Sequence, residues 1–268
     1  MSLRINTNVE AFNAHRQLSG TSDKLAKSME RLSSGYRINR AADDAAGLAI
    51  SEKLQGQIGG LDQAQRNSQD AISLVQTAEG NLQEVHSMLQ RVRELAVQYK
   101  NGSLSANDKA AIQSEVNMLG SEVERIGSSA QFNGILLLSA ASNITFQVGA
   151  QDGEVISVST ISLGSSAPPS AFQLTATGSD ISEIDAAIDA ISAQRAQFGA
   201  VQNRLEHTLS NLAVYQENLT ASESRIRDVD MAAEMVNFTK LQILQQSGTA
   251  MLAQANQTPQ SVLQLLKG

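Results

Sequence analysis

Few side chains in this sequence have the type and spacing that chemistry on a substrate requires. There is no cysteine, which excludes disulfide bonds and thiolate metal sites. The histidines His15, His86 and His207 are far apart and form no His-x-x-x-His pair, the spacing that places two ring nitrogens on one helix face. We interpret them as polar residues of helix faces or interfaces, and we expect neither a metal nor another cofactor.

The adjacent carboxylates Asp43 and Asp44 are the remaining candidates for acid–base chemistry. Neighbouring side chains on a helix or strand point apart, and no second acidic or histidine cluster is evident nearby. Capping of the helix that follows is the better interpretation. The methionines Met231, Met235 and Met251 are interpreted as adaptable core filler rather than as a ligand set. The sequence therefore predicts a protein that is not an enzyme.

The composition favours a helical protein that is held together by aliphatic side chains. Only 3% of the 268 residues are aromatic and none is tryptophan. The net charge of −7 argues against nucleic acid as a partner, because affinity for phosphates depends on lysine and arginine. No run of about 18 apolar residues occurs, so no membrane helix is expected. The start of the sequence lacks the apolar core of a secretory signal, which predicts either a cytosolic protein or export without a cleaved signal.

Apolar residues recur every three or four positions over long stretches, which is the spacing of one helix face. Such stripes run from Leu54 to Ala96, from Ile112 to Ile126 and from Ile181 to Leu219. A stripe of this length must be covered by another helix, so the first and last thirds of the chain are predicted to pack together. The residues expected to carry this subunit packing include Val85, Leu89, Leu205, Leu209 and Leu212.

Capping and turn signals mark where these elements begin and end. Asp43 or Asp44 and a Ser105-x-x-Asp108 capping box each precede a stripe, and Asp180-x-x-Glu183 precedes the last of them. The helices are expected at about residues 5–32, from Asp43 or Asp44 to about Lys100, from the capping box through the stripe that ends at Ile126, from Asp180 onward, and at about 231–266. Asn133-Gly134 is expected to form a turn. Period-two alternation predicts a β-hairpin of residues 144–148 and 155–158, and residues 172–174 predict a further short strand.

The two outermost helices are the weakest alone. Their polar faces are rich in glutamine and asparagine, and only each other is available to cover their apolar stripes. Terminal segments of this kind are often disordered until a partner covers them. The expected partner is another copy of this chain, and the residues expected to pack there are Phe238, Leu241, Leu244, Leu252 and Leu265.

Several stretches of the chain closely resemble bacterial flagellin. The resemblance covers about residues 1–138 and 180–268, whereas the short middle of the chain is the least diagnostic part. The stretches that carry it are ERLSSGYRINRAADDAAGLAISE (30–52), GLDQAQRNSQDAISLVQTAEGN (60–81), LQRVRELAVQ (89–98), QFNG (131–134), RIRDVDMAAEM (225–235) and QANQTPQSVLQLLKG (254–268).

The resemblance implies a mainly α protein, an elongated antiparallel helical bundle or coiled-coil rod with a small β-hairpin region in the middle of the chain. It also implies export of the unfolded chain by the flagellar type III apparatus and polymerisation outside the cell into a helical filament for swimming. The expected parts are an inner-tube helix and connecting spoke (1–42), rod helices (43–138), a short β-rich region (139–179), a rod helix (180–222), and a second spoke with the C-terminal inner-tube helix (223–268).

The resemblance further implies partners other than the chain itself, namely an export chaperone, the filament cap and hook–filament junction proteins, and innate immune receptors of hosts. By motif, Arg91, Leu95 and Glu115 match the site bound by the vertebrate Toll-like receptor for flagellin. Tyr36 and Arg40 depart from the family's pattern in the segment that resembles the peptide sensed by plant receptors. The matching residues of that segment are Arg31, Ser34, Gly35, Ile38, Asp43, Asp44 and Gly47.

Three other interpretations stay open at this point. A hook–filament junction protein shares terminal patterns of this kind, although the intact central and terminal motifs favour flagellin. A secreted enzyme with helical arms would need a convergent set of catalytic residues. A cytosolic coiled-coil scaffold would share the stripes but would not occur in extracellular filaments.

Overall fold

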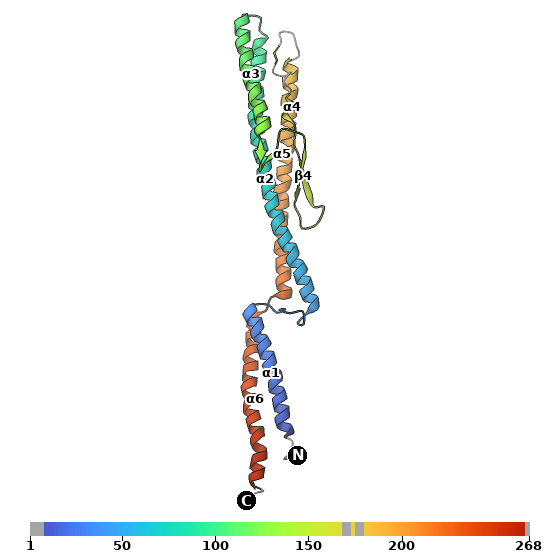
Figure 1. Cartoon of the computed structure of the whole chain (residues 1–268), viewed down its shortest axis with the longest axis vertical. Helices are drawn as coiled ribbons and strands as arrows, with labels where there is room; N and C mark the ends of the chain where they lie inside the picture. Colours follow the sequence, from blue (N-terminus) through green and yellow to red (C-terminus); the bar gives the residue numbers. More distant parts are fainter. Residues whose placement is uncertain (1–7, 168–172, 175–179, 266–268) are drawn as a thin grey trace. The chain divides into compact units, whose positions relative to one another are not determined.

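The structure, a computed structural model, describes residues 8–167, 173–174 and 180–265 (Figure 1). The fold is mainly helical with small antiparallel strand pairs, as the sequence predicts. The chain divides into two compact units. Unit 1 comprises Met1–Gly56 with Asn218–Gly268, and unit 2 comprises Gln57–Glu217.

Unit 1 is built on the pair of helices α1 (Val9–Ser34) and α6 (Met231–Leu265), which lie side by side (Figure 1). The N-terminus of α1 is capped by Asn8, whose side-chain oxygen accepts a hydrogen bond from the Ala11 N–H at 3.0 Å. Its C-terminus ends at Gly35, whose φ of 77° is the left-handed conformation that glycine adopts at little cost. The predicted terminal helices are thus confirmed within the residues described.

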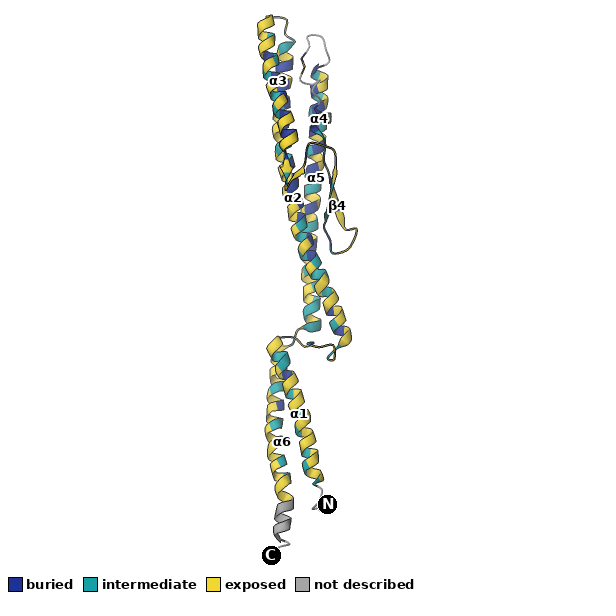
Figure 2. Cartoon of the chain, viewed as in Figure 1, coloured by how far each residue is buried: buried dark blue, intermediate teal, exposed yellow. Residues whose placement is uncertain are grey.

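Unit 2 contains α3 (Ala106–Ser129) and most of α2 (Ala45–Tyr99) and α5 (Asp180–Arg227), which pack against one another. Ion pairs between Arg93 and Asp185 and between Arg195 and Glu79 show that α2 and α5 run in opposite directions. Figure 2 shows the buried positions on the sides where the helices meet. The stripes identified in the sequence supply this core, which includes Leu82, Val85, Leu89, Val92, Val116, Val123, Ile184, Ile191 and Phe198.

Local signals fix the ends of these helices. Asp44 accepts a hydrogen bond from the Gly47 N–H at 2.9 Å and so caps α2. Ser105 and Asp108 form the predicted reciprocal capping box of α3. Asp180 and Glu183 lie in the first turn of α5, where their carboxylates face the positive end of the helix dipole. α5 ends at Arg227, beyond the last residue of the predicted stripe, Leu219.

Two small hairpins follow α3. Strands β1 (Gln131–Phe132) and β2 (Ile135–Leu136) pair across Asn133-Gly134, where both residues have positive φ. Strands β3 (Asn143–Gln147) and β4 (Val155–Ser159) form the predicted hairpin in the register Phe146 to Ile156. The loop of this hairpin approaches α2 closely, because a methyl group at Gly60 would lie 3.0 Å from the Ala150 side chain.

The chain after the hairpin is only partly described. A short helix, α4 (Leu163–Ser166), follows β4. The predicted strand at residues 172–174 is not found at Gln173 and Leu174, which lie outside any strand, although the Leu174 side chain is buried in the core of unit 2. Phe172 and the predicted loop at Pro168-Pro169 lie outside the described residues.

Substitution of valine by alanine at two positions of α2 tests the assignment of this core. Val92 is fully buried, whereas Val97 is 52% exposed. Val92→Ala should destabilise the chain by about 2 kcal/mol through lost apolar contacts and a residual cavity, and Val97→Ala by less than about 0.5 kcal/mol. Both changes alter helix propensity equally, so the difference reports packing. Denaturant unfolding followed by circular dichroism measures it, and equal losses in the two variants would contradict this core.

Candidate functional site

The contact between α1 and α6 is a narrow seam with a heptad-like spacing. Along both helices, positions that are withdrawn from solvent alternate at intervals of three and four residues, as in a two-stranded coiled coil. The seam positions of α1 are Ala11, Ala14, Leu18, Thr21, Leu25, Ser28 and Leu32. Those of α6 are Glu234, Phe238, Leu241, Gln245, Gly248, Leu252 and Ala255.

Three contacts set the antiparallel register of this seam. At one end, the Asn8 side-chain amide donates a hydrogen bond to the Ala255 carbonyl at 2.7 Å. In the middle, the Leu18 side chain lies so close to Gly248 that an added methyl group there would be 3.2 Å from it. At the other end, the Ser28 hydroxyl donates a hydrogen bond to the Glu234 carboxylate at 2.5 Å, and the Ser28 side chain is buried.

Much of the apolar surface of the two helices lies outside the seam. Phe12 and Val236 are each 72% exposed, and among the described side chains of α1 and α6 only Ser28 and Leu241 are buried (Figure 2). The other large apolar side chains exposed on these helices are Val9, Met29, Met231, Met235, Ile243, Leu244 and Met251. Exposed apolar side chains in this number on a helix pair are typical of an interface with another protein.

The structure divides the residues that were expected to carry subunit packing into two groups. Phe238, Leu241 and Leu252 lie in the seam of unit 1, Leu244 is exposed, and the Leu265 side chain lies outside those described. Val85, Leu89 and Leu205 are fully buried within unit 2, with Leu212 nearly so and Leu209 partly exposed. The stripes of unit 2 are therefore covered within one chain, whereas the terminal helices keep exposed apolar surface.

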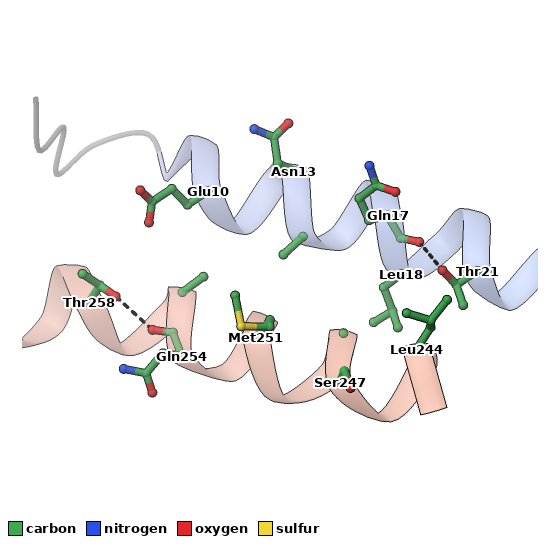
Figure 3. A pocket seen from close by; sticks show the side chains of 13 residues that line it. Glu10, Asn13, Gln17, Leu18, Thr21, Leu244, Ser247, Met251, Gln254 and Thr258 are labelled. Atoms are coloured by element: carbon green, nitrogen blue, oxygen red, sulfur yellow. Dashed lines mark hydrogen bonds between the residues drawn. The ribbon is translucent and has the colours of Figure 1, made fainter. Parts of the chain in front are cut away.

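The methionines of the last helix do not fill a core in the single chain. Met231, Met235 and Met251 are 48%, 50% and 65% exposed, which corrects the expectation that they are core filler. Met251 lines a groove of about 750 Å³ between α1 and α6, together with Leu18 and Leu244 (Figure 3). Asn13 and Gln254 also border the groove, and their amide groups point away from the space between the helices (Figure 3).

The segment that follows α1 is joined to the segment between α5 and α6. The Arg37 N–H donates to the Arg227 carbonyl at 2.6 Å, and the Val229 N–H donates to the Gly35 carbonyl at 3.0 Å. The Arg227 guanidinium lies 4.7 Å from the centre of the Tyr36 ring, a cation–π contact. These contacts hold the two connecting segments of unit 1 together.

Asp43 organises the first connecting segment through its charge. Its carboxylate pairs with the Lys27 ammonium at 2.5 Å and accepts hydrogen bonds from the Asn39 and Arg40 N–H groups at 3.3 and 3.2 Å. The hydrogen bond from Lys27, followed by those from the Arg40 and Asn39 backbone, lowers the pKa of Asp43 to about 2. Asp43 and Asp44 thus have separate structural roles, with Asp44 at the start of α2.

The other residues of the plant-receptor-like segment are mostly engaged in the same connection. The Ile38 side chain is 1% exposed, and a methyl group at Gly47 would collide with it and with Asp44. Gly35 ends α1, and the Arg31 guanidinium lies 3.9 Å from the Glu234 carboxylate of α6. Ser34 is exposed, and its hydroxyl accepts a hydrogen bond from the Tyr36 N–H at 3.1 Å.

The three residues matched to the vertebrate receptor site lie together in unit 2, but they differ in exposure. Arg91 on α2 bonds to Glu115 on α3 at 3.0 Å and to Glu94 at 3.1 Å, and all three side chains are well exposed. These carboxylates raise the pKa of Arg91, with the hydrogen bond to Glu115 the largest cause. Leu95 is only 2% exposed and belongs to the core. The accessible part of this site is therefore the Arg91–Glu115 pair.

Several residues of these sites were not identified from the sequence. Ser28 pairs with Glu234, and Tyr36 pairs with the segment at Arg227, across about 190 to 206 positions of sequence, and no spacing in the sequence predicts these partners. A heptad count that admits alanine, serine and glycine would have found most seam positions, but not Thr21, Glu234 and Gln245. Among the described residues no group of three or more histidines and carboxylates is placed to hold a metal ion.

Comparisons with known proteins cover nearly the whole chain. The family models described as the bacterial flagellin N-terminal and C-terminal helical regions match residues 5–143 and 181–266. A flagellin of Halalkalibacterium halodurans is 54% identical over 98% of this chain and 99% of its own length, and a flagellin of Bacillus subtilis is 48% identical over 99% and 100%. The crystal structure of Bacillus cereus flagellin is similar with a TM-score of 0.50 and 32% identity, over 55% of this chain and 88% of that one.

A titration tests the electrostatic role of Asp43. Because its pKa in the folded chain is lowered to about 2, the ion pair stabilises the connecting segment fully above about pH 4, the usual range of an aspartate. This contribution should be lost as the pH falls from about 4 to about 2. The carboxyl carbon resonance of Asp43 should titrate near pH 2, and Lys27→Gln should move the midpoint upward. A midpoint near 4 in the unmodified chain would refute the pairing.

Proposed function

Because this chain belongs to the bacterial flagellin family and is a subunit of the flagellar filament, we propose that it is exported unfolded by the flagellar type III system and polymerises outside the cell through the surface of α1 and α6. The exposed apolar surface of this helix pair is the observation that carries the proposal. Phe12 and Val236 are the most exposed large apolar side chains on it. No helix in the described part of the chain has the length and apolar character needed to span a bilayer.

The free energy of burying the apolar surface of the helix pair favours the assembled chain over the monomer. Burial of apolar surface contributes roughly 25 cal/mol per Å², so side chains such as Phe12, Val236 and Ile243 stabilise a copy that covers them. The seam alone leaves much apolar surface exposed, because only Ser28 and Leu241 among its described side chains are buried. A non-closing contact between identical copies generates a helical filament rather than a ring.

The same surface accounts for the proposed export partners. Before assembly, the apolar face of such a helix must be covered by a partner, or the chain must be kept unfolded, because exposed apolar surface promotes non-specific association. The exposed face of α6, with Val236, Ile243 and Met251, therefore suits an export chaperone before secretion. The filament cap and the hook–filament junction proteins would meet the same helices at the two ends of the filament.

Receptor recognition is proposed at two places. The Arg91–Glu115 pair offers an exposed, planar guanidinium of the kind that interfaces favour as an anchor. In the plant-receptor-like segment, Ile38 and Gly47 are packed and the backbone of residues 35–37 is bonded to that of 227–229. A receptor that binds this segment as an extended peptide would therefore need it released from the folded subunit.

A charge introduced on the exposed face of α6 tests the assembly proposal. Val236→Asp places a carboxylate at a position that is 72% exposed, so the monomer should fold normally while the charge blocks burial against another copy. Elongation of filament seeds by the purified chain, observed by electron microscopy, should be abolished. A matched control is Val155→Asp on the hairpin, where the valine is 47% exposed and elongation should persist.

Two outcomes would count against this proposal. Normal filaments from the Val236→Asp chain would show that the α6 surface is not the assembly interface. An unmodified chain that caps seeds without extending them would instead identify a junction protein. Circular dichroism of each variant distinguishes a loss of assembly from a loss of helical structure.

The receptor proposal is tested by exposed substitutions that leave the core intact. Arg91→Ala and Glu115→Ala should each weaken binding of the monomer to the ectodomain of the vertebrate Toll-like receptor for flagellin by about tenfold, the effect expected of an interface anchor. Arg125→Ala removes a similar exposed arginine, paired with Glu122, and should leave binding unchanged. Unaltered binding of the Arg91→Ala and Glu115→Ala chains in a surface plasmon resonance titration would overturn the assignment.

A further inference from the structure

The thioether side chains of this protein are concentrated on the exposed surface of α1 and α6. The sequence has seven methionines and no cysteine, so thioethers are its only sulfur groups. Met29 on α1 is 54% exposed, in addition to the three methionines of α6 already described. In unit 2, Met118 on α3 is exposed, whereas Met88 on α2 packs against the core.

The four methionines of unit 1 lie at defined places on the helix pair. Met29 and Met235 are the sequence neighbours of Ser28 and Glu234, which are hydrogen-bonded, so both lie at the same end of the seam. Met231 precedes Met235 by four residues and therefore shares its helix face. Met251 lies in the groove farther along α6, where its sulfur faces the space between the helices (Figure 3).

We propose that Met29, Met231, Met235 and Met251 form a reversible oxidation site that controls polymerisation. The inference rests on the proposed assembly through α1 and α6. Hydrogen peroxide supplies the oxygen: the sulfur lone pair attacks one peroxide oxygen, so that an S–O bond forms as the O–O bond breaks. The proton of the transferred oxygen passes to the departing hydroxide, which leaves as water, and the thioether is oxidised by two electrons to the sulfoxide. No cysteine competes for the oxidant within the chain.

The oxidation changes how well this surface can be buried. A sulfoxide is a polar group with a strong hydrogen-bond acceptor, whereas the thioether is apolar and adaptable. Burial of that acceptor against the apolar side chains of another copy leaves it without a donor, which disfavours association. In the filament the same sulfurs are covered by neighbouring copies, so oxidation acts on the free subunit and spares the assembled one.

The experiment compares elongation of filament seeds by chains treated with hydrogen peroxide and by untreated chains. Peptide mass spectrometry should locate oxygen on the four methionines of α1 and α6 in the free chain, and circular dichroism should show that its helices persist. The critical concentration for elongation should rise about tenfold or more, the effect of weakening one buried apolar contact. Treatment with methionine sulfoxide reductases A and B should restore elongation.

Matched variants connect the effect to these side chains. A chain with M29L, M231L, M235L and M251L keeps apolar side chains of similar volume and should elongate seeds both before and after peroxide. Met118→Leu should remain as sensitive as the unmodified chain. Met251→Gln, which imitates the polarity of the sulfoxide at an exposed position, should impair elongation without any oxidant.

Several results would overturn the proposal. They are normal elongation by the fully oxidised chain, equal peroxide sensitivity of the four-leucine chain, and oxidation of all four methionines at undiminished rates within intact filaments. Failure of the untreated chain to extend seeds would be a different result, because it would refute the proposed assembly itself and this inference with it.

Discussion

The narrowness of the seam between α1 and α6 is the constraint on which the rest of the molecule depends. The seam brings two helices together, but only Ser28 and Leu241 of its described side chains are buried, so it removes little apolar surface from water. The core of unit 2 differs, because leucine, isoleucine, valine and phenylalanine side chains from α2, α3 and α5 are buried against one another. The apolar side chains of unit 2 are therefore covered within one chain, whereas those of the α1–α6 pair remain largely exposed. This difference is physically suited to a subunit that must be stable and yet polymerise.

The connecting segments keep the two terminal helices in register. The N–H groups of Arg37 and Val229 donate hydrogen bonds to backbone carbonyls of the opposite segment, and the Arg227 guanidinium contacts the Tyr36 ring. The Asp43 carboxylate pairs with Lys27 and accepts hydrogen bonds from two backbone N–H groups. Hydrogen bonds of this kind satisfy backbone groups that a helix end would otherwise leave unpaired. Rigid connecting segments limit the number of conformations that the helix pair can adopt, which lowers the entropy lost when another copy covers it.

The sequence predicted the helices well because their determinants are local. The stripe through Val85 and Leu89, the capping box at Ser105, and the turn at Asn133-Gly134 are each contained within a few residues, and the structure confirms all of them. The contacts of unit 1 could not be found in this way. Ser28 with Glu234 and Tyr36 with Arg227 join distant parts of the chain, and neither pair has a spacing that indicates its partner.

Counting only large apolar residues also misplaced some side chains. By spacing, Met235, Leu244 and Met251 belong to an apolar stripe of α6. The seam instead runs through Glu234, Leu241 and Gly248, and the three larger apolar side chains are exposed outside it. Leu95 matches the receptor site by motif alongside Arg91, but its helix position directs it into the core. An apolar stripe predicts that one face of a helix is covered by another helix. Tertiary packing decides which of two adjacent helix faces is covered within the chain.

Amide hydrogen exchange, measured for the same chain as a monomer and as a filament, tests the central claim most directly. If cover from other copies stabilises the terminal helices, the amides of α1 and α6 should exchange rapidly in the monomer and slowly in the filament, while those of α2, α3 and α5 in unit 2 should be protected in both. Strong and equal protection of α1 and α6 in the monomer would show that the pair is stable by itself, and it would contradict the account.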